Sequence, residues 1–279
     1  MDAAGPARCF RRRTGAARGT LAIRLRHLVR QGLLRHERQS DLSRRMEYRL
    51  TDKGLALYPV ALCMWQWENR WGGEFGLPLR LVHVRCGESL SPSLDCATCS
   101  QPLSVRTLAY SVSPKTRAGT PPRRRRRLQG LPDHTADGQR TLLFHTADTV
   151  GDHWTALLVG ALLLGLHRHD DLREAVGMAT NILADRLQRL LSAGVVERRL
   201  YQARPPRHEY RLTDKGLELF PYTLALHVWA LHWLPLKGGA ELKLTHSACN
   251  HVLQTTLRCA HCGVALQAKD VTTAKGSKP

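Results

Sequence analysis

Nine residues of this chain, from Glu47 to Leu55, recur without change from Glu209 to Leu217. The offset of 162 residues (209 − 47) is too long for a solenoid repeat, so it indicates a duplicated domain. Residues on both sides match at the same offset: Leu21, Leu25, Gly32 and Trp67 correspond to Leu183, Leu187, Gly194 and Trp229. Any fold or function predicted for this chain must therefore suit two similar units.

Length and charge narrow the class of protein. A chain of 279 residues is long enough for about two ordinary domains. Its net charge of +19 favours a polyanionic partner, most often nucleic acid. The longest apolar run, Trp154 to Leu166, is shorter than the roughly 20 residues that span a bilayer, and the N-terminus has no signal-peptide pattern. We expect a cytoplasmic, nucleoid-associated protein.

The second copy begins with a pattern of three helices. Asp152 is placed to cap a helix that runs to about Leu166, and residues 171–176 form a short second helix. A third helix follows the turn at Gly177, with Thr180 or Asn181 as its cap, and runs to about Ser192. It has leucines on one face and these polar residues on the other: Asn181, Asp185, Gln188 and Arg189. The pattern predicts a helix-turn-helix, although periodicity alone also allows an ordinary helical hairpin.

The segment that follows distinguishes these two readings. Residues 195–200 and 208–212 are predicted to be strands, joined by a turn at Pro205-Pro206. A two-stranded hairpin directly after a helix-turn-helix is a wing. Its arginines are placed to contact phosphates: Arg198, Arg199, Arg204 and Arg207.

The second copy resembles the HxlR-type family of bacterial winged-helix transcriptional regulators over residues 150–234. The resemblance rests on residues 151–154, 185–187, 193–196, 205–206 and 210–216, which follow the family's order and spacing. The MarR-type family shares the Leu-Thr-x-Lys-Gly turn and ranks second. The resemblance implies that the third helix enters the major groove, with Thr180, Asn181, Asp185 and Gln188 facing bases, while Arg189 and the four wing arginines hold phosphates.

The first copy has no counterpart of the first helix, because the residue matching Asp152 would precede Met1. We expect either a start site placed too late, which we favour, or a partly eroded copy. Its candidate DNA contacts are Arg18 and Arg26 on the helix that matches the third helix of the second copy, and Arg35, Arg38, Arg44 and Arg45 on the wing. We call this helix of each copy the reading helix. The family resemblance implies dimers, so the two copies pair either within one chain as a pseudo-dimer or as a homodimer. Five tryptophans are candidates for the contact between them: Trp65, Trp67, Trp71, Trp229 and Trp233.

Each copy ends in the pattern His-x2-Cys-x9-Cys-x2-Cys. Two close-spaced ligand pairs suit tetrahedral zinc, so we predict two structural zinc sites, one per copy. The ligands are His83, Cys86, Cys96 and Cys99 in the first site and His246, Cys249, Cys259 and Cys262 in the second. His251 and His261 compete with His246 for the fourth position.

The sequence thus predicts a mainly α chain with small β-hairpins (α+β), built from two tandem winged helix-turn-helix domains, each with a zinc-ribbon-like knuckle. The expected divisions are a first winged helix (1–80), a first knuckle (81–110), a basic Pro/Arg-rich linker (111–148), a complete winged unit (149–240), a second knuckle (241–272) and a disordered tail (273–279). We predict a sequence-specific regulator that binds double-stranded DNA; a zinc-ribbon adaptor for proteins is the alternative. The sequence shows no enzyme-like cluster. It is compatible with a small-molecule effector, which it does not identify.

Overall fold

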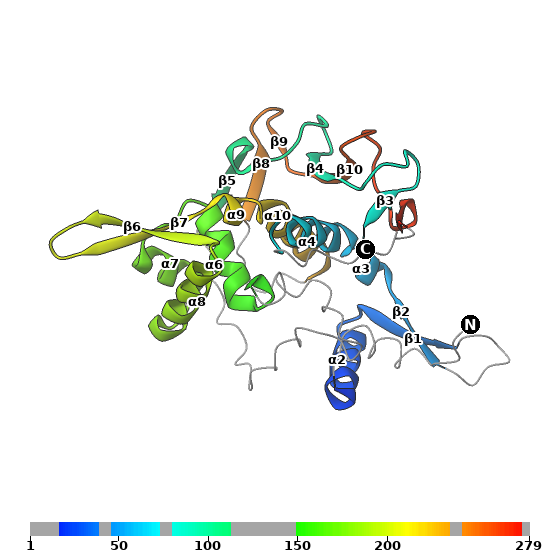
Figure 1. The fold of residues 1–279 in the computed structure, drawn as a ribbon, viewed down its shortest axis with the longest axis horizontal. Coiled ribbons are helices and arrows are strands. Elements are labelled where there is room, and N and C mark those ends of the chain that lie inside the picture. The colour runs from blue at the N-terminus through cyan, green and yellow to red at the C-terminus, as the bar shows by residue number, and fades with distance from the viewer. Residues whose placement is uncertain (1–16, 39–45, 73–79, 113–148, 235–241, 275–279) are drawn as a thin grey trace.

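The computed structural model describes residues 17–38, 46–72, 80–112, 149–234 and 242–274 (Figure 1). They form a mixed α+β protein with two winged units and a set of short strands, which confirms the predicted fold class. The complete unit contains α6 (His153–Leu163), α7 (His169–Val176), α8 (Thr180–Ser192), β6 (Val196–Gln202), β7 (Arg207–Leu212), α9 (Asp214–Leu217) and α10 (Phe220–Trp233).

Local chemistry sets the ends of these helices. The carboxylate of Asp152 accepts hydrogen bonds from the backbone N–H groups of Trp154 (3.0 Å) and Thr155 (3.3 Å), so it caps α6 as predicted. Gly177 ends α7 in the left-handed conformation, with φ of 66°. The expected cap of α8 was wrong: Ala179 is the N-cap and makes no side-chain bond, and Thr180 is already helical.

The described part of the first unit contains α2 (Arg18–Arg30), β1 (Leu34–Arg38), β2 (Met46–Leu50), α3 (Asp52–Leu55) and α4 (Tyr58–Trp71). β1 pairs with β2 and β6 pairs with β7, both antiparallel, so each unit has its wing. The wing of the second unit projects far from the rest of the molecule (Figure 1).

The repeated Thr-Asp-Lys-Gly motif connects each wing to the following helices. Thr213 donates from its hydroxyl to the carbonyl of Gly194 (2.7 Å) and accepts from the N–H of Gly216 (3.2 Å). A Cβ at Gly216 would overlap the carbonyl oxygen of Val195, so this close approach of two backbone segments requires glycine. Gly54 stands in the same relation to the carbonyl of Leu33. The glycine of the motif is therefore required in both copies for the same steric reason.

The helices α4 and α10 lie side by side and form the seam between the two units (Figure 1). The indole N–H of Trp67 donates to the carbonyl of Lys215 (2.9 Å), and the indole N–H of Trp229 donates to that of Lys53 (3.0 Å). These bonds are equivalent under the repeat, since each tryptophan reaches the turn that follows the other unit's wing. The two copies thus pair within the chain as a pseudo-dimer with an isologous contact.

The strands of residues 80–112 and 242–274 form one shared β-module. It contains β3 (Leu81–His83), β4 (Pro92–Cys96), β5 (Leu108–Val112), β8 (Leu242–His246), β9 (His251–Val252), β10 (Thr255–Cys259) and β11 (Val271–Thr273), with 3-10 turns at Val105–Thr107 and Ala268–Asp270. β3 pairs with β11, β8 pairs with β5 and β9, and β4 pairs with β10. Leu94 lies opposite its repeat equivalent Leu257, so the pseudo-twofold axis passes between them.

This pairing changes two expectations about the domains. The segments 81–110 and 241–272 were expected to fold as separate knuckles, but every sheet of the shared β-module takes strands from both. The boundaries also move: β5 runs to Val112, beyond the expected start of the linker, and Thr273 belongs to β11 rather than to a tail. Residues 113–148 and 275–279 lie outside the described part of the chain.

Candidate nucleic-acid interface and metal sites

One face of α8 is fully available to a partner. Its leucines pack into the core, with Leu183 and Leu190 at 0% exposure and Leu187 at 2%. The five residues predicted to face DNA are all exposed: Thr180, Asn181, Asp185, Gln188 and Arg189. The amphipathic helix thus presents a polar surface about three turns long.

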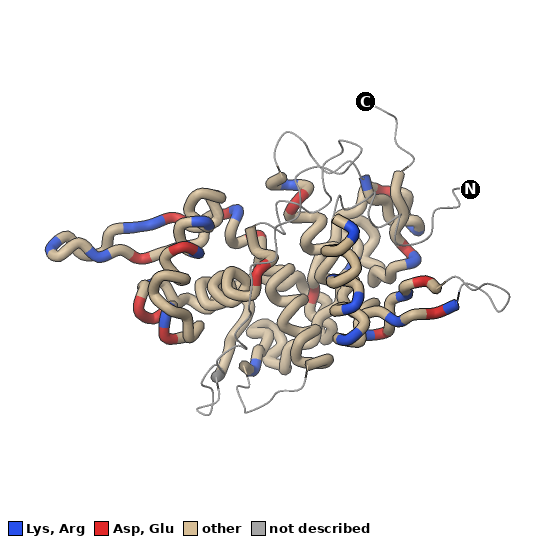
Figure 2. Tube along the Cα trace, turned by 90° about the horizontal axis from the view of Figure 1, so that it is seen from below, with Lys and Arg blue, Asp and Glu red and all other residues tan. Residues whose placement is uncertain are grey.

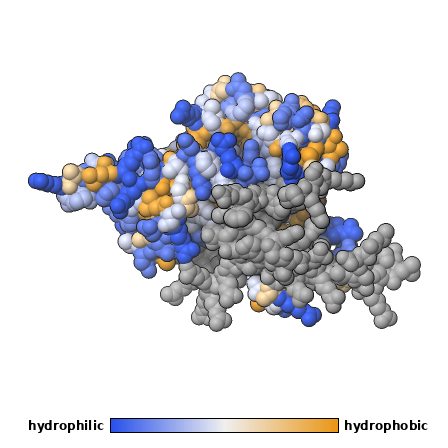
Figure 3. All heavy atoms as spheres, viewed as in Figure 1, coloured by the Kyte–Doolittle hydropathy of each residue, from blue (hydrophilic) through white to orange (hydrophobic). Residues whose placement is uncertain are grey.

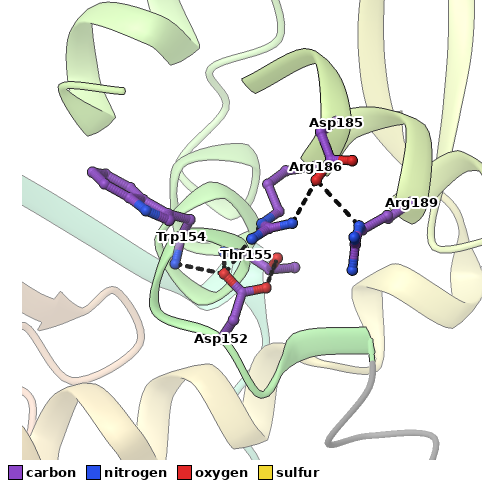
Figure 4. Close-up of polar contacts among 6 residues, drawn as sticks. All are labelled: Asp152, Trp154, Thr155, Asp185, Arg186 and Arg189. Carbon is purple, nitrogen blue, oxygen red and sulfur yellow. Dashed lines mark hydrogen bonds and ion pairs between the residues drawn. The ribbon is translucent and has the colours of Figure 1, made fainter. Parts of the chain in front are cut away.

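A chain of ion pairs ties that surface to the rest of the unit (Figure 4). The carboxylate of Asp152, which caps α6, accepts a bond from Nε of Arg186 (3.2 Å). The same guanidinium donates from Nη1 to Asp185 (2.6 Å), and Asp185 also pairs with Nε of Arg189 (3.2 Å). Only 15% of the Arg186 side chain is exposed, so it anchors α8 on α6 from within. The sequence pattern predicts neither this role of Arg186 nor the second use of Asp152.

The wing of the second unit carries the expected arginines. All four are exposed: Arg198 and Arg199 lie along β6, and Arg204 and Arg207 lie at the tip of the hairpin, where Figure 2 shows basic residues. Glu197 pairs with Arg199 at 2.5 Å, so part of that charge is compensated within the strand. In space-filling view the wing is a mostly hydrophilic projection (Figure 3).

The first unit presents a corresponding but different set. Arg18 and Arg26 are exposed on α2, and Arg35 and Arg38 are exposed on β1; Figure 2 shows basic and acidic residues alternating on this wing. Glu37 lies between Arg35 (3.7 Å) and Arg49 (3.0 Å) and offsets some of this charge. The predicted contacts Arg44 and Arg45 lie outside the described residues.

The first metal cluster joins the two copies. It groups His83 and Cys86 with Cys259 and Cys262, with all ligand atoms within 4.8 Å of one another. Nδ1 of His83 lies 3.2 Å from Sγ of Cys86 and 3.4 Å from Sγ of Cys262, and the sulfurs of Cys86 and Cys259 are 3.9 Å apart.

The second cluster is related to the first by the pseudo-twofold axis. It groups Cys96 and Cys99 with His246 and Cys249. Nδ1 of His246 lies 3.3 Å from the sulfur of Cys99 and 3.4 Å from that of Cys249, and the sulfurs of Cys96 and Cys249 are 3.8 Å apart. The eight predicted ligands are all present. Their grouping within each copy was wrong, because each cluster takes one ligand pair from each copy.

These spacings fit a tetrahedral metal ion. Thiolate and imidazole ligands at zinc-like bond lengths lie about 3.5 to 3.8 Å from one another. His83 and His246 are fully buried, and the Nε2 atom of each has no hydrogen-bond partner in the described structure, while Nδ1 faces the thiols. His251 is exposed and directed to the carbonyl of Cys249, and His261 is exposed, so neither belongs to a cluster.

One thiol in each cluster has a lowered pKa, whereas the pKa values of Cys86 and Cys99 are raised. Burial opposes loss of the Cys96 proton, but the N–H groups of Cys99 and Thr98 donate to its sulfur and lower its pKa to about 6. The pKa of Cys259 is lowered in the same way, against burial, by Cys262 and His261. Cys63 lies outside both clusters, and burial raises its pKa to about 12, which makes it an inert thiol. Thiolates are the form that binds metals, so both clusters could hold a metal ion.

Comparison with known proteins identifies the winged units. A model of the HxlR-like helix-turn-helix family matches residues 9–75 and 149–237, one match in each copy. The chain belongs to this family. Among its relatives, an uncharacterised HTH-type transcriptional regulator of Mycobacterium tuberculosis strain H37Rv, Rv3095, is 35% identical over 129 residues, which are 46% of this chain and 82% of the relative. The HTH-type regulator YvaP of Bacillus subtilis strain 168 is 36% identical over 31% of this chain and 82% of its own length.

Among solved structures, the chain is similar to PA1607, a candidate transcription factor. The two are 30% identical, and the match covers 47% of this chain and 91% of the other, with a TM-score of 0.42. Within the described residues, no helix is long and apolar enough to cross a membrane.

Proposed function

We propose that this HxlR-like protein is a transcriptional regulator whose two winged units bind two half-sites on one DNA duplex. The single observation that carries the proposal is the exposed polar face of α8 next to an arginine-bearing wing. Helix α8 would enter the major groove, with Thr180, Asn181 and Gln188 at base edges. Asp185, also predicted to face bases, would act chiefly by orienting Arg189 through the ion pair between them.

The wings would hold the phosphate backbone on either side. Arg204 and Arg207 flank the tip of the second wing and are exposed, as phosphate contacts must be. In the first unit, Arg35 and Arg38 would play the same part. Such a regulator acts in the cytoplasm, at the nucleoid.

The two half-sites would differ in sequence. Under the repeat, Thr180, Asn181, Asp185 and Gln188 of α8 correspond to Arg18, Gly19, Ile23 and Arg26 of α2. Side chains of different chemistry read different bases, so the operator would be asymmetric. One chain would contact both half-sites, about one helical turn apart.

Selection of bound duplexes from a random-sequence pool tests this proposal. We expect a bipartite, asymmetric site, with a binding constant that falls steeply with salt. The double variant R204Q/R207Q should reduce the slope of log affinity against log salt by about 2. The control R106Q removes an exposed arginine from the shared β-module and should leave the slope unchanged. A pool that shows no enrichment, or a salt-independent complex, would contradict DNA binding and favour a protein adaptor.

We further propose that both clusters hold zinc in a closed, structural role. The support is the donor set of three thiols and one imidazole, with spacings that suit a four-coordinate ion. In the double variant C86S/C262S the second cluster stays complete, so the chain should retain one zinc ion. In C86S/C99S both clusters are broken, and zinc should be lost. Separate knuckles in each copy would give the opposite result, which measurement of zinc per chain distinguishes.

A further inference from the structure

Each metal cluster joins the first copy to the second, so a bound ion affects the distance between the reading helices α2 and α8. We propose that the two metal ions form a clasp that holds the two winged units at one separation, so that metal occupancy controls binding to a duplex with two half-sites. The inference rests on the proposed DNA-binding function. It adds a means of regulation for that function.

The clusters close large loops of the chain. In the second cluster, Cys99 and His246 are 147 positions apart, and in the first, His83 and Cys262 are 179 positions apart. The whole second winged unit, residues 149–234, lies within both loops. An ion bound in either cluster therefore restricts where the second unit can move relative to the first.

The shared β-module reaches the wings through the seam helices. α4 contacts β4 of the module, and it packs along α10. The indole N–H groups of Trp67 and Trp229 donate to the carbonyls of Lys215 and Lys53, each three residues beyond the end of a wing strand, β7 or β2. An ordered β-module thus keeps α4 packed against α10. This packing in turn fixes the position of each wing where it joins its unit.

Other polar contacts also cross the seam: Nζ of Lys215 lies 5.4 Å from the ring of Trp67, and Nζ of Lys53 lies 5.7 Å from that of Trp229. Glu218 accepts from the indole of Trp71 (2.8 Å) and pairs with Arg70 (3.0 Å), but the side chain of Arg70 is 66% exposed. Exposed ion pairs contribute little to stability in water. The buried residues of the module, such as Leu94 and Leu257 on the pseudo-twofold axis, share one hydrophobic core with the seam helices. Without metal, the Nδ1 atoms of the buried His83 and His246 would also lose the ion that they coordinate. The metal-free module should therefore open more readily than the winged units unfold.

The test compares zinc-loaded and chelator-stripped full-length chain on two duplexes from the selection described above. One duplex has both half-sites, and in the other the half-site read by α2 is scrambled. We expect zinc removal to weaken binding to the complete duplex by about 10-fold or more. Without the ions the two winged units are no longer held at the separation of the half-sites, so binding of one unit no longer favours binding of the other. Binding to the single half-site should change by less than about twofold, because α8 is anchored within its own unit.

A reciprocal measurement does not depend on DNA affinity in the stripped state. If zinc tightens binding to the complete duplex, that duplex must tighten zinc binding by the same factor. Zinc equilibrated with a competing chelator should shift toward the protein when the complete duplex is added, and should not shift with the single half-site. The variant C99S/C249S, which keeps only the first cluster, should show an intermediate effect. The control C63A removes a buried thiol outside both clusters and should behave as the parent chain.

The outcomes separate the two proposals. Equal affinity of loaded and stripped chain for the complete duplex would overturn the clasp. An equal loss on both duplexes would also overturn it, since zinc would then maintain the fold of each unit rather than their separation. A zinc-loaded chain that binds neither duplex would instead refute the DNA-binding function on which the clasp depends.

Discussion

The two winged units are alike where they meet and different where they face outward. At the seam, the bonds from Trp67 to Lys215 and from Trp229 to Lys53 are equivalent. At the reading helices, the leucines of α8 join the large core, whereas Leu21 and Leu25 of α2 form a small separate cluster with Leu34. The duplication has thus kept the pairing of the copies and has changed how each copy holds and presents its reading helix.

The polar side of the reading helices differs as well. In α8, Asp185 connects Arg186 and Arg189, and Arg186 reaches Asp152 on the neighbouring helix. The position in α2 that matches Asp185 is Ile23, which is 54% exposed. The second unit therefore has a built-in ion-pair network for its reading surface, and the first unit has an apolar residue at the centre of that surface.

The largest expected effect separates the two helix anchors. Leu187 is 2% exposed within the large core, and its repeat equivalent Leu25 is 5% exposed in the small cluster. Leu187→Ala should lower the free energy of unfolding by about 3 kcal/mol. Leu25→Ala should cost less than half as much, because a small cluster can collapse into the cavity. Urea unfolding followed by circular dichroism measures both, and equal losses would show that α2 is anchored as firmly as α8.

The glycines of the repeated motif should instead respond alike. A Cβ at Gly216 would meet the carbonyl oxygen of Val195, and one at Gly54 would meet that of Leu33, so alanine at either position forces backbone segments apart. Each substitution should cost about 2 kcal/mol in the same unfolding assay. Gly19→Ala is the control, because it meets nothing within 4 Å in α2 and should be neutral or stabilise the helix by up to ~1 kcal/mol. Unequal costs at the two motif glycines would show that the wings attach differently.

The sequence predicted the winged units and the ligand set because both depend on local patterns. The leucine spacing of α8 and the Thr-Asp-Lys-Gly turn act within a few residues, as does each pair of metal ligands. The grouping of the pairs could not be predicted in this way. In a duplicated chain, the ligand pair of Cys96 and Cys99 fits His246 and Cys249 as well as it fits its own copy, and only strand pairing across the axis decides between them.

The anchoring role of Arg186 was missed for a related reason. Its main partner, Asp152, is 34 positions away in the chain, and a helix pattern does not show which residue of another helix will lie opposite. A usable signal was present, since Arg186 adjoins the leucine face of α8 rather than its outer face. A charged residue at the edge of a buried face requires a partner.

Arg186→Gln tests whether this anchor is particular to the second unit. The variant loses charge-assisted bonds to Asp152 and Asp185 and should lower the free energy of unfolding by about 1.5 kcal/mol. It should also weaken binding to the half-site read by α8. Without Arg186 the carboxylate of Asp185 is no longer held in place, so Asp185 no longer orients Arg189. Arg24→Gln at the matching position is the comparison, and we expect no change at the α8 half-site. If both variants weakened the same half-site, the network would not act locally.

The smallest expected effect concerns the symmetric seam. Trp67→Phe and Trp229→Phe each remove one indole donor and leave a carbonyl of the other unit without that bond. Each substitution should lower the free energy of unfolding by about 1 kcal/mol. Trp67 is 2% exposed and Trp229 is only half-buried, so the first substitution should cost slightly more. Because each bond fastens one unit to the other, both variants should weaken binding to a duplex with two half-sites more than binding to one. A variant that destabilises the chain and leaves this ratio unchanged would mean that the indoles only fill space, and that the shared β-module alone sets the separation of the units.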